Sequence, residues 1–316
     1  MFHPTTHKFT SFLFSPVYNI ASWIGIHNPA LLVKIRYFQR FKKRIDLKHP
    51  RDLNEKILYA KVYTDTSQWA DLFDKYKVRD YVAECGCADT LTKLYGHWEK
   101  VEDIDYDSLP ETFIFKASNG DGNGQYHFVK SKTEMLAKDK QKVDQKLRYW
   151  LSRKNVGAAS GEPYLRFVKP RILAEELLPF EQGRTSLIDY KIWCINGHVE
   201  YIWTCSDRDK DGTDVMTYDR DWNAHPEFSV FDSRYRRGDI LEKPSNLRGL
   251  IDVAEKLSKP FPVVRVDLYH INGKIYFGEM TFTSLGGMMN FYTQDFLNML
   301  GDKIDIKSFP PKKKGK

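Results

Sequence analysis

The stretch VVRVDLYHINGKIYFGEMTF, from Val263 to Phe282, decides the fold of this chain. Its apolar residues alternate on both sides of Asn272-Gly273, and Asn-Gly is the strongest short signal for a two-residue hairpin turn. The pattern therefore predicts two antiparallel strands joined by the turn Ile271–Lys274.

Three polar side chains interrupt this hairpin where a sheet would otherwise bury apolar groups: Arg265, Asp267 and Glu279. Alternate residues of a strand share a face, so Arg265 lies with Asp267, and Glu279 lies with Thr281. Pairing the strands through the turn is then expected to bring both carboxylates together beside one arginine. Such carboxylates repel each other without a cation between them, and Mg²⁺ usually takes one or two carboxylates with phosphates and water. The hairpin therefore predicts a metal–nucleotide site.

Composition describes a folded, basic protein. The chain has 316 residues, 41% of them hydrophobic and 14% aromatic, which is ample for a buried core and two or three lobes. A formal charge of +7 and a pI near 9.0 favour anionic partners such as nucleotides, acidic saccharides or a membrane, or indicate only a generic basic surface. Cys85-Gly86-Cys87 is a weak metal or redox signal, and idle thiols in a reducing cytoplasm are the favoured interpretation. We recognise no signal peptide and expect a cytoplasmic protein.

Both ends of the chain are basic. Residues 9–44 combine interrupted apolar patches, too short to span a bilayer, with KIRYFQRFKKR from Lys34 to Arg44. This composition is compatible with peripheral contact with the inner face of a membrane. The alternative, which the sequence alone favours, is a helical arm packed on the main domain with its charges in water. The tail Pro310–Lys316 is interpreted as a solvated end, and no nucleic-acid partner is expected.

Periodicity and capping predict the remaining elements. Helical spacing runs from Asp52 to about Val82. The capping box that begins at Ser131 opens one predicted helix through Leu151, and a second helix is predicted over Asn246–Lys259. Predicted strands cover 113–117, 125–129, 171–178, 191–195 and 199–205.

The loop SNGDGNG, residues 118–124, separates the first two of these strands. Its glycines let backbone amides approach an anion closely. It is neither a Walker A loop nor a Rossmann fingerprint, because no Gly-Lys-Ser/Thr follows and the next element is a strand. Lys116, at the end of the preceding strand, would neutralise phosphate oxygens that the loop cradles. The alternative is a flexible hairpin loop beside a solvated lysine.

Acidic residues also interrupt the apolar pattern of the later predicted strands. Glu175 and Glu176 are adjacent in an apolar run, so one of them points inward unless the strand lies at a sheet edge with solvated acids. An inward glutamate would accept a hydrogen bond from an adenine amino group. Asp189 and Lys191 share a face of the next strand, where they would hold a ribose or phosphate or form an ordinary ion pair.

The order of these motifs resembles the ATP-grasp superfamily and, within it, the TupA-like ATP-grasp family of bacterial polysaccharide clusters. The resemblance covers about Arg51 to Phe291 and rests on DLNEKI, DKYKVRDYV, FKASNGDGNG, ILAEELL, DYKIWCING, SDR at 206–208, YDRDWN and the last hairpin. Two departures stand out. Thr281 occupies a position where many ATP-grasp enzymes carry Asn, and the loop reads Asn119-Gly-Asp-Gly where a His- or Ser-rich variant is expected.

The resemblance implies an α+β ATP-grasp fold, with two α+β lobes clamping a nucleotide and a helical N-terminal region. The implied divisions are an amphipathic helical arm over 1–50, a mainly helical region over 51–110, a small lobe with the glycine-rich flap over 111–178, a large lobe with the metal site over 179–309, and a basic tail over 310–316.

The resemblance also implies roles for individual residues, with ATP and Mg²⁺ as cofactors. The residues implied to bind the nucleotide are Lys75 and Lys116 at the phosphates, Asn119, Gly120, Gly122 and Gly124 in the flap, Glu175, Glu176 and Leu178 at the adenine, and Asp189 at the ribose. The implied metal ligands are Asp267, Glu279 and Thr281. Lys191 would contact the γ-phosphate or acceptor, and Arg265 would stabilise charge on an acyl-phosphate or tetrahedral adduct.

The leading hypothesis is an ATP-dependent carboxylate–amine ligase that attaches an amino acid to a sugar acid in cell-surface polysaccharide assembly. Its partners would be a small-molecule or saccharide acceptor and an amine donor. Alternatives are a glycosyltransferase of capsular assembly, using an acidic pair around Arg208 or Arg220, a phosphotransferase of the same fold, and a polyanion-binding scaffold.

Overall fold

The computed structural model describes residues 16–120, 124–180 and 184–312, and the chain folds into two compact units. Unit 1 gathers residues 1–66, 158–163 and 180–316, and unit 2 gathers residues 67–157 and 164–179. Each unit is therefore assembled from segments distant in the sequence. The finer five-part division expected above stays a prediction.

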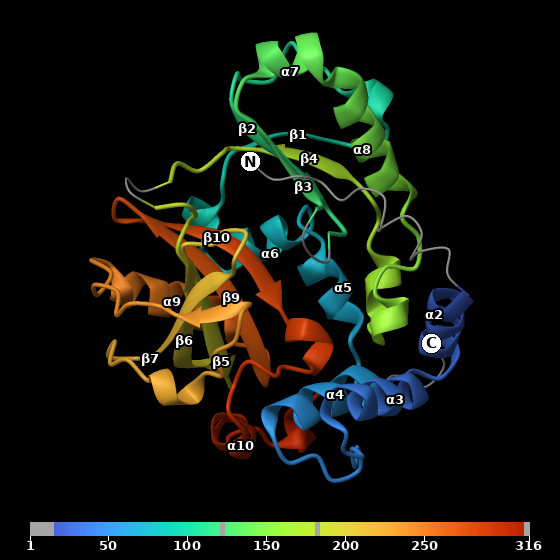
Figure 1. Cartoon of the computed structure of the whole chain (residues 1–316), viewed down its shortest axis with the longest axis vertical. Coiled ribbons are helices and arrows are strands. Elements are labelled where there is room, and N and C mark those ends of the chain that lie inside the picture. The colour runs from blue at the N-terminus through green and yellow to red at the C-terminus, as the bar shows by residue number, and fades with distance from the viewer. Residues whose placement is uncertain (1–15, 121–123, 181–183, 313–316) are drawn as a thin grey trace. The chain divides into compact units, whose positions relative to one another are not determined.

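Unit 1 contains a six-stranded sheet with helices around it (Figure 1). Its α-helices are α2 (Pro16–His27), α3 (Pro29–Phe41), α4 (Leu53–Tyr63), α9 (Leu247–Ser258) and α10 (Gln294–Asp302). Its strands are β5 (Asp189–Ile195), β6 (His198–Ser206), β7 (Thr213–Asp219), β8 (Tyr235–Arg237), β9 (Val263–Ile271) and β10 (Lys274–Thr281). Short 3-10 turns are η3 (Ala158–Ser160), η5 (Pro226–Phe228), η6 (Ser284–Gly287) and η7 (Ile306–Ser308).

The six strands follow the order β10-β9-β5-β6-β7-β8, antiparallel except for the pair β7–β8. Helix α9 packs on one face, where the Cys194 thiol reaches the Ala254 carbonyl at 3.8 Å. Because strand residues alternate, Lys191 of β5 lies on the opposite face. The charged residues of the sheet therefore gather away from α9.

The hairpin β9–β10 forms as predicted, with its turn at Asn272-Gly273, where both residues have positive φ (50° and 80°). Regular pairing from this turn would set Glu279 opposite Val266, whose side chain lies on the wrong face. A register shift at Gly278 inserts one residue and pairs Glu279 with Asp267 instead. A Cβ at Gly278 would lie 2.9 Å from the Asp267 carbonyl oxygen, so glycine is required for this close approach.

Unit 2 is built on a four-stranded antiparallel sheet in the order β1-β4-β2-β3. Its strands are β1 (Leu94–Trp98), β2 (Phe113–Ala117), β3 (Tyr126–Val129) and β4 (Ile172–Glu175). Its helices are α5 (Ser67–Phe73), α6 (Val78–Glu84), α7 (Lys132–Lys138) and α8 (Lys140–Ser152), with 3-10 turns η1 (Ala88–Thr90), η2 (Val101–Asp103) and η4 (Pro163–Phe167) near or within it. Helix α8 lies beside the sheet (Figure 1) and packs on β2 and β4. Phe113, Phe115, Leu147 and Trp150 belong to the core between them.

Two predicted elements differ from the structure. The helix expected to run to Leu151 is broken at Asp139, which leaves helical geometry (φ −126°, ψ 0°) and separates α7 from α8. Its start is correct, because the Ser131 hydroxyl accepts the Glu134 amide at 3.1 Å. The strand predicted over 171–178 is only β4, which ends at Glu175, so Glu176 and Leu178 lie in the connection beyond it.

Candidate active site

A row of charged side chains crosses three neighbouring strands of unit 1. Lys191 of β5 pairs with Asp267 of β9, and Asp267 pairs with Glu279 of β10. One pair further along, Arg265 of β9 lies opposite Thr281 of β10. The sheet register therefore brings together the residues predicted for metal binding and catalysis.

Asp267 is the centre of this row, and both of its oxygens are held by cations. Arg265 donates from Nε to Oδ1 and from Nη2 to Oδ2, each at 2.7 Å, and Lys191 Nζ lies 2.5 Å from Oδ2. Burial raises the pKa of Asp267, and the two cations oppose that rise. Burial alone would lower the pKa of Lys191, but the carboxylates of Asp189 and Asp267 raise it above its ordinary value. Both cations therefore remain charged.

Arg265 links Asp267 to three further groups. Its Nη1 donates to the Ser284 hydroxyl at 2.6 Å, and its Nη2 lies 3.1 Å from the Thr281 hydroxyl and 3.5 Å from Glu279 Oε1. The guanidinium is almost fully buried, and its rigid fork suits several oxygen partners at once. Arg265 is therefore fixed in one orientation beside both carboxylates.

Asp189 adds a third carboxylate with an unused oxygen. Its Oδ2 accepts Lys191 Nζ at 2.7 Å, while Arg208, half exposed, lies 3.9 Å from the same oxygen. Its Oδ1 is buried and has no hydrogen-bond partner within the described part of the chain. Leaving such an acceptor unpaired costs about 1–3 kcal/mol, so this oxygen is suited to a hydroxyl or other donor of a ligand.

Ser284 belongs to the short segment η6 that follows β10 and is held by a contact with α4. Leu285, Gly286 and Gly287 all have positive φ, and the Gly286 carbonyl accepts a hydrogen bond from Lys61 Nζ at 2.6 Å. Burial lowers the pKa of Lys61 to about 8, with Glu162 acting in the opposite direction. A side chain from α4 thus supports the loop that carries a contact of Arg265.

A second cluster lies in unit 2, on the face of its sheet that carries Glu175. Lys116 Nζ lies 2.8 Å from Glu175 Oε2, the Thr92 hydroxyl donates to the same oxygen at 3.0 Å, and Arg79 lies 3.7 Å from Oε1. Although burial raises it, Lys116 and Arg79 together lower the pKa of Glu175 below its ordinary value. Glu175 therefore stays ionised and fixes the ammonium of Lys116 at the start of the glycine loop.

The described part of the glycine loop contains Asn119, Gly120 and Gly124, while Gly122 lies outside the described residues. Gly124 has φ 97° and open space where a Cβ would be. The buried Asn119 Oδ1 has no hydrogen-bond partner among the described residues. Lys75 approaches the same segment through its backbone amide, which donates to the Ser118 carbonyl at 3.2 Å.

The two residues beyond β4 are placed differently from each other. Glu176 exchanges backbone and side-chain hydrogen bonds with Lys93, since its amide donates to the Lys93 carbonyl at 2.9 Å and its Oε2 accepts the Lys93 amide at 3.3 Å. Leu178 is buried. Their predicted adenine contacts stay predictions.

Sequence reasoning missed several members of these clusters. Arg79 and Thr92 were not singled out, although Arg79 lies within the motif DKYKVRDYV that supported the resemblance. Ser284 directly follows the hairpin, but a serine after a strand carries no distinctive signal. The buried Lys61 lies in α4, which also contains Asn54, Glu55 and Lys56, so its burial has no distinctive sequence signal.

Three of the four acids that flank Arg208 and Arg220 are engaged in local structure. Asp207 accepts Arg184 at 2.9 Å, and Asp209 accepts Arg236 at 3.1 Å. Asp219 accepts the backbone and side-chain amides of Asn223 within its own turn. Asp207, Asp209 and Asp219, which a glycosyltransferase would use to bind the metal of a nucleotide sugar, therefore already have partners in unit 1.

The hairpin offers a donor set that fits a hard cation. Among the described residues, no group of three or more His, Cys, Asp or Glu side chains is arranged to hold a metal ion. Mg²⁺ needs only one or two carboxylates when phosphates and water complete its octahedron, and Asp267 and Glu279 supply two.

Comparison with known families identifies the class of protein. A family model described as TupA-like ATPgrasp matches residues 55–305. The chain is therefore an ATP-dependent ligase of the ATP-grasp class, with the α+β fold that the sequence predicted. It belongs to the TupA-like ATP-grasp family, as its motifs suggested.

Several solved structures are similar to this chain at low identity. They include D-alanine–D-alanine ligase from Bacillus anthracis complexed with ATP (TM-score 0.46, 13% identity, 78% of this chain and 68% of that chain). They also include ATP-grasp ligase PsnB complexed with minimal precursor, Mg and ADP (0.41, 13%, 76% and 60%). A third is N5-carboxyaminoimidazole synthetase from Staphylococcus aureus complexed with ADP (0.42, 11%, 72% and 49%), so this chain spans about half the length of that protein. No curated protein matches the chain.

Proposed function

We propose that this protein is an ATP-dependent carboxylate–amine ligase that works through an acyl-phosphate. The acceptor we propose is a sugar acid and the donor an amino acid, joined during cell-surface polysaccharide assembly. The family match supports the reaction class, and the resemblance to a polysaccharide-cluster family supports the substrates.

The observation that carries the proposal is the fixed group around Asp267. A buried arginine and a part-buried lysine flank one carboxylate, and a second carboxylate lies beside them on the same sheet face. This combination of fixed positive charge and hard oxygen donors suits a phosphoryl or acyl-phosphate group, because transfer depends on positioning and electrostatic stabilisation.

Each residue has a distinct role in this proposal. Asp267 and Glu279, with the Thr281 hydroxyl, would hold Mg²⁺, which supplies charge neutralisation for the phosphates. Arg265, held by Ser284, would donate to the oxyanion that forms when the amine attacks the activated carbonyl. Lys191 would contact the transferred phosphate or the acceptor.

Each unit also carries its own candidate nucleotide contacts. Asp189 Oδ1, buried and unpaired among the described residues, would accept a ribose hydroxyl. Lys116 would contact phosphate oxygens beside the glycine loop, with Lys75 as a second cation. Glu175 would keep Lys116 in position through the 2.8 Å ion pair and would itself approach the adenine. Glu176 and Leu178 complete the proposed adenine contacts.

The test is to incubate the purified protein with ATP, Mg²⁺, a set of uronic acids and a set of amino acids, and to measure product masses. We expect ADP, phosphate and an amide. With the amine omitted, hydroxylamine should trap an acyl hydroxamate, and ¹⁸O from the acceptor carboxylate should appear in the released phosphate. ADP with a stable phosphoester would instead identify a kinase. In a parallel reaction supplied with a nucleotide sugar, sugar transfer without ADP formation would identify a glycosyltransferase.

A variant of Arg265 separates its catalytic role from nucleotide binding. Arg265→Lys keeps the charge but loses the fork, so kcat should fall on the order of 100-fold while ATP affinity changes little. Arg237→Lys, at an exposed position of β8, is the matched control and should behave as wild type. Equal losses in kcat and ATP affinity would contradict the assigned role.

A further inference from the structure

The helices α2 and α3 each present a stripe of apolar side chains to solvent. In α2 the stripe is Val17, Ile20 and Trp23, and in α3 it is Leu31, Ile35 and Phe38. Trp23 and Phe38 are 63% and 51% exposed. Residues three or four apart share a helix face, so each stripe is continuous along its helix. We define these six residues as the apolar stripes.

The opposite face of α3 anchors it to unit 1. Leu32, Val33 and Tyr37 are buried, and Arg36 donates to the Ala159 carbonyl at 3.2 Å. The Asn28 side chain caps the helix by accepting the Leu31 amide at 3.0 Å. Because its buried face is already packed, α3 holds its stripe outward on a fixed support.

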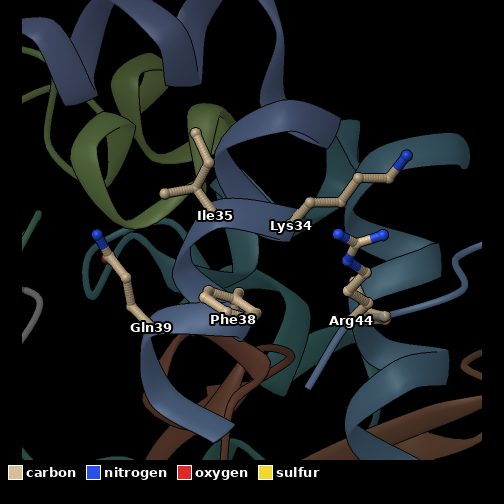
Figure 2. A pocket seen from close by; sticks show the side chains of 6 residues that line it. Lys34, Ile35, Phe38, Gln39 and Arg44 are labelled. Atoms are coloured by element: carbon tan, nitrogen blue, oxygen red, sulfur yellow. The ribbon is translucent and has the colours of Figure 1, made fainter. Parts of the chain in front are cut away.

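The α3 stripe borders a shallow hollow of about 720 Å³, lined by Ile35, Phe38, Ile45, Lys34, Gln39 and Arg44 (Figure 2). Figure 2 shows Ile35 and Phe38 together on α3, with the charged ends of Lys34 and Arg44 near each other beside them. Apolar and cationic side chains therefore meet on one open surface.

The charge of this segment is entirely of one sign. The first acidic residue of the chain is Asp46, whereas Lys34, Lys42, Lys43 and Arg44 are all exposed. Within the described ranges, no ion pair involves Lys34 or Arg44. These cations are therefore available to an external anionic surface.

We propose that α2 and α3 dock this protein onto an anionic lipid bilayer. The apolar stripes would enter the boundary between headgroups and acyl chains, while the basic side chains extend to lipid phosphates. Trp23 is a residue type enriched at that depth. Among the described helices, none is long and apolar enough to cross a bilayer, so the contact we propose is peripheral.

The charge pattern favours a bilayer over a protein partner or a second copy of this chain. A second copy would bring the same cations against each other, since the segment contains no acid to pair with them. A bilayer offers a broad anionic surface that tolerates any spacing of the cations, and it also accommodates several exposed apolar side chains without a matching pocket.

The experiment measures co-sedimentation of the full chain with vesicles of phosphatidylcholine containing 30% phosphatidylglycerol, and with vesicles of phosphatidylcholine alone. We expect binding to the anionic vesicles, weakened by salt, and much weaker binding to the neutral ones. Lys34→Glu/Arg44→Glu should reduce binding about 25-fold or more, from roughly fivefold for each of the two basic residues. Ile35→Ser/Phe38→Ser should reduce it about tenfold or more.

Two control variants carry matched changes on other surfaces. Arg248→Glu/Lys256→Glu makes the same charge change at exposed positions of α9, and Ile240→Ser removes another exposed apolar side chain. Both should bind vesicles as wild type does, and ATP turnover should be unchanged in all these variants. An equal loss of binding in the controls, or equal binding to neutral vesicles, would overturn the proposal. Absence of vesicle binding would also overturn it, and a dimer that the α3 variants dissociate would then identify the surface as an interface between two copies of this chain. The vesicle assay does not depend on which reaction the enzyme catalyses.

Discussion

Replacing the two proposed metal-binding carboxylates should separate their structural and catalytic roles. Asp267 is 3% exposed and bonded to Arg265 and Lys191, whereas Glu279 is 43% exposed. Asp267→Asn and Glu279→Gln each preserve shape and remove a charge. Both should abolish ATP turnover, but only the first should affect the fold strongly.

The expected difference follows from the contacts. In Asp267→Asn one amide oxygen replaces two carboxylate oxygens, so one of the Arg265 donors at 2.7 Å faces an NH₂ group, and the Lys191 contact weakens. Removing one partner of a buried ion pair costs about 3–5 kcal/mol. A domain of roughly 200 residues loses about 2–4 °C per kcal/mol, so the melting temperature should fall by about 6–20 °C. Glu279→Gln should lower the free energy of unfolding by no more than about 1 kcal/mol, and therefore the melting temperature by no more than roughly 4 °C.

The measurement is thermal unfolding by circular dichroism without nucleotide or Mg²⁺, followed by ATP turnover at a temperature where both variants are folded. An Asp267→Asn protein that melts with the wild type would show that its ion pairs contribute nothing to folding. A Glu279→Gln protein that retains normal turnover would refute the metal assignment.

Three further outcomes are expected. Lys116→Ala should weaken ATP binding about 10- to 100-fold by calorimetry through loss of a charge-assisted phosphate contact, and Lys93→Ala, at an exposed position of the same unit, should not. The folded-state pKa of Lys61 is lowered to about 8, so from there to about 10.5 the unfolded chain binds a proton that the folded chain lacks. Between these pH values the unfolding free energy of the wild type should rise by up to about 3 kcal/mol more than that of Lys61→Met. Urea titration at several pH values measures this difference, and parallel curves of stability against pH would contradict the lowered pKa. Gly287→Ala should destabilise more than Gly273→Ala, since both have φ near 80° but only a Cβ at Gly287 would lie 3.0 Å from a neighbouring side chain; equal melting temperatures would contradict that contact.

Local signals predicted most of the strands, and the hairpin residues predicted to share a site lie together in unit 1. Asn272-Gly273 predicted a hairpin turn, which forms with positive φ at both residues, and Asn196-Gly197 forms a second turn of the same kind between β5 and β6. Alternation placed Arg265 with Asp267 on one face, as the structure confirms. Family motifs then predicted the ATP-grasp fold, which the family match bears out.

The remaining features depend on contacts between distant segments. The alternation of residues in the hairpin gives no indication of the shift at Gly278, because a strand glycine fits either a bulge or a regular pair. The support of Gly286 by Lys61 joins residues 225 positions apart. Asp139 breaks a helix whose periodicity continues across it, since only capping competition distinguishes that position.

Because of the extra residue at Gly278, the face on which Glu279 lies depends on whether the number of residues between it and Asp267 is odd or even. Between the bulge and the exposed Asn272-Gly273 turn, residues can be added or removed as cross-strand pairs without changing which face any later side chain occupies. A single added residue would exchange the two faces for everything beyond it and would direct Glu279 toward α9. The turn is therefore a suitable place to graft a reporter or affinity loop, because residues added in pairs at the tip leave the face of Glu279 unchanged.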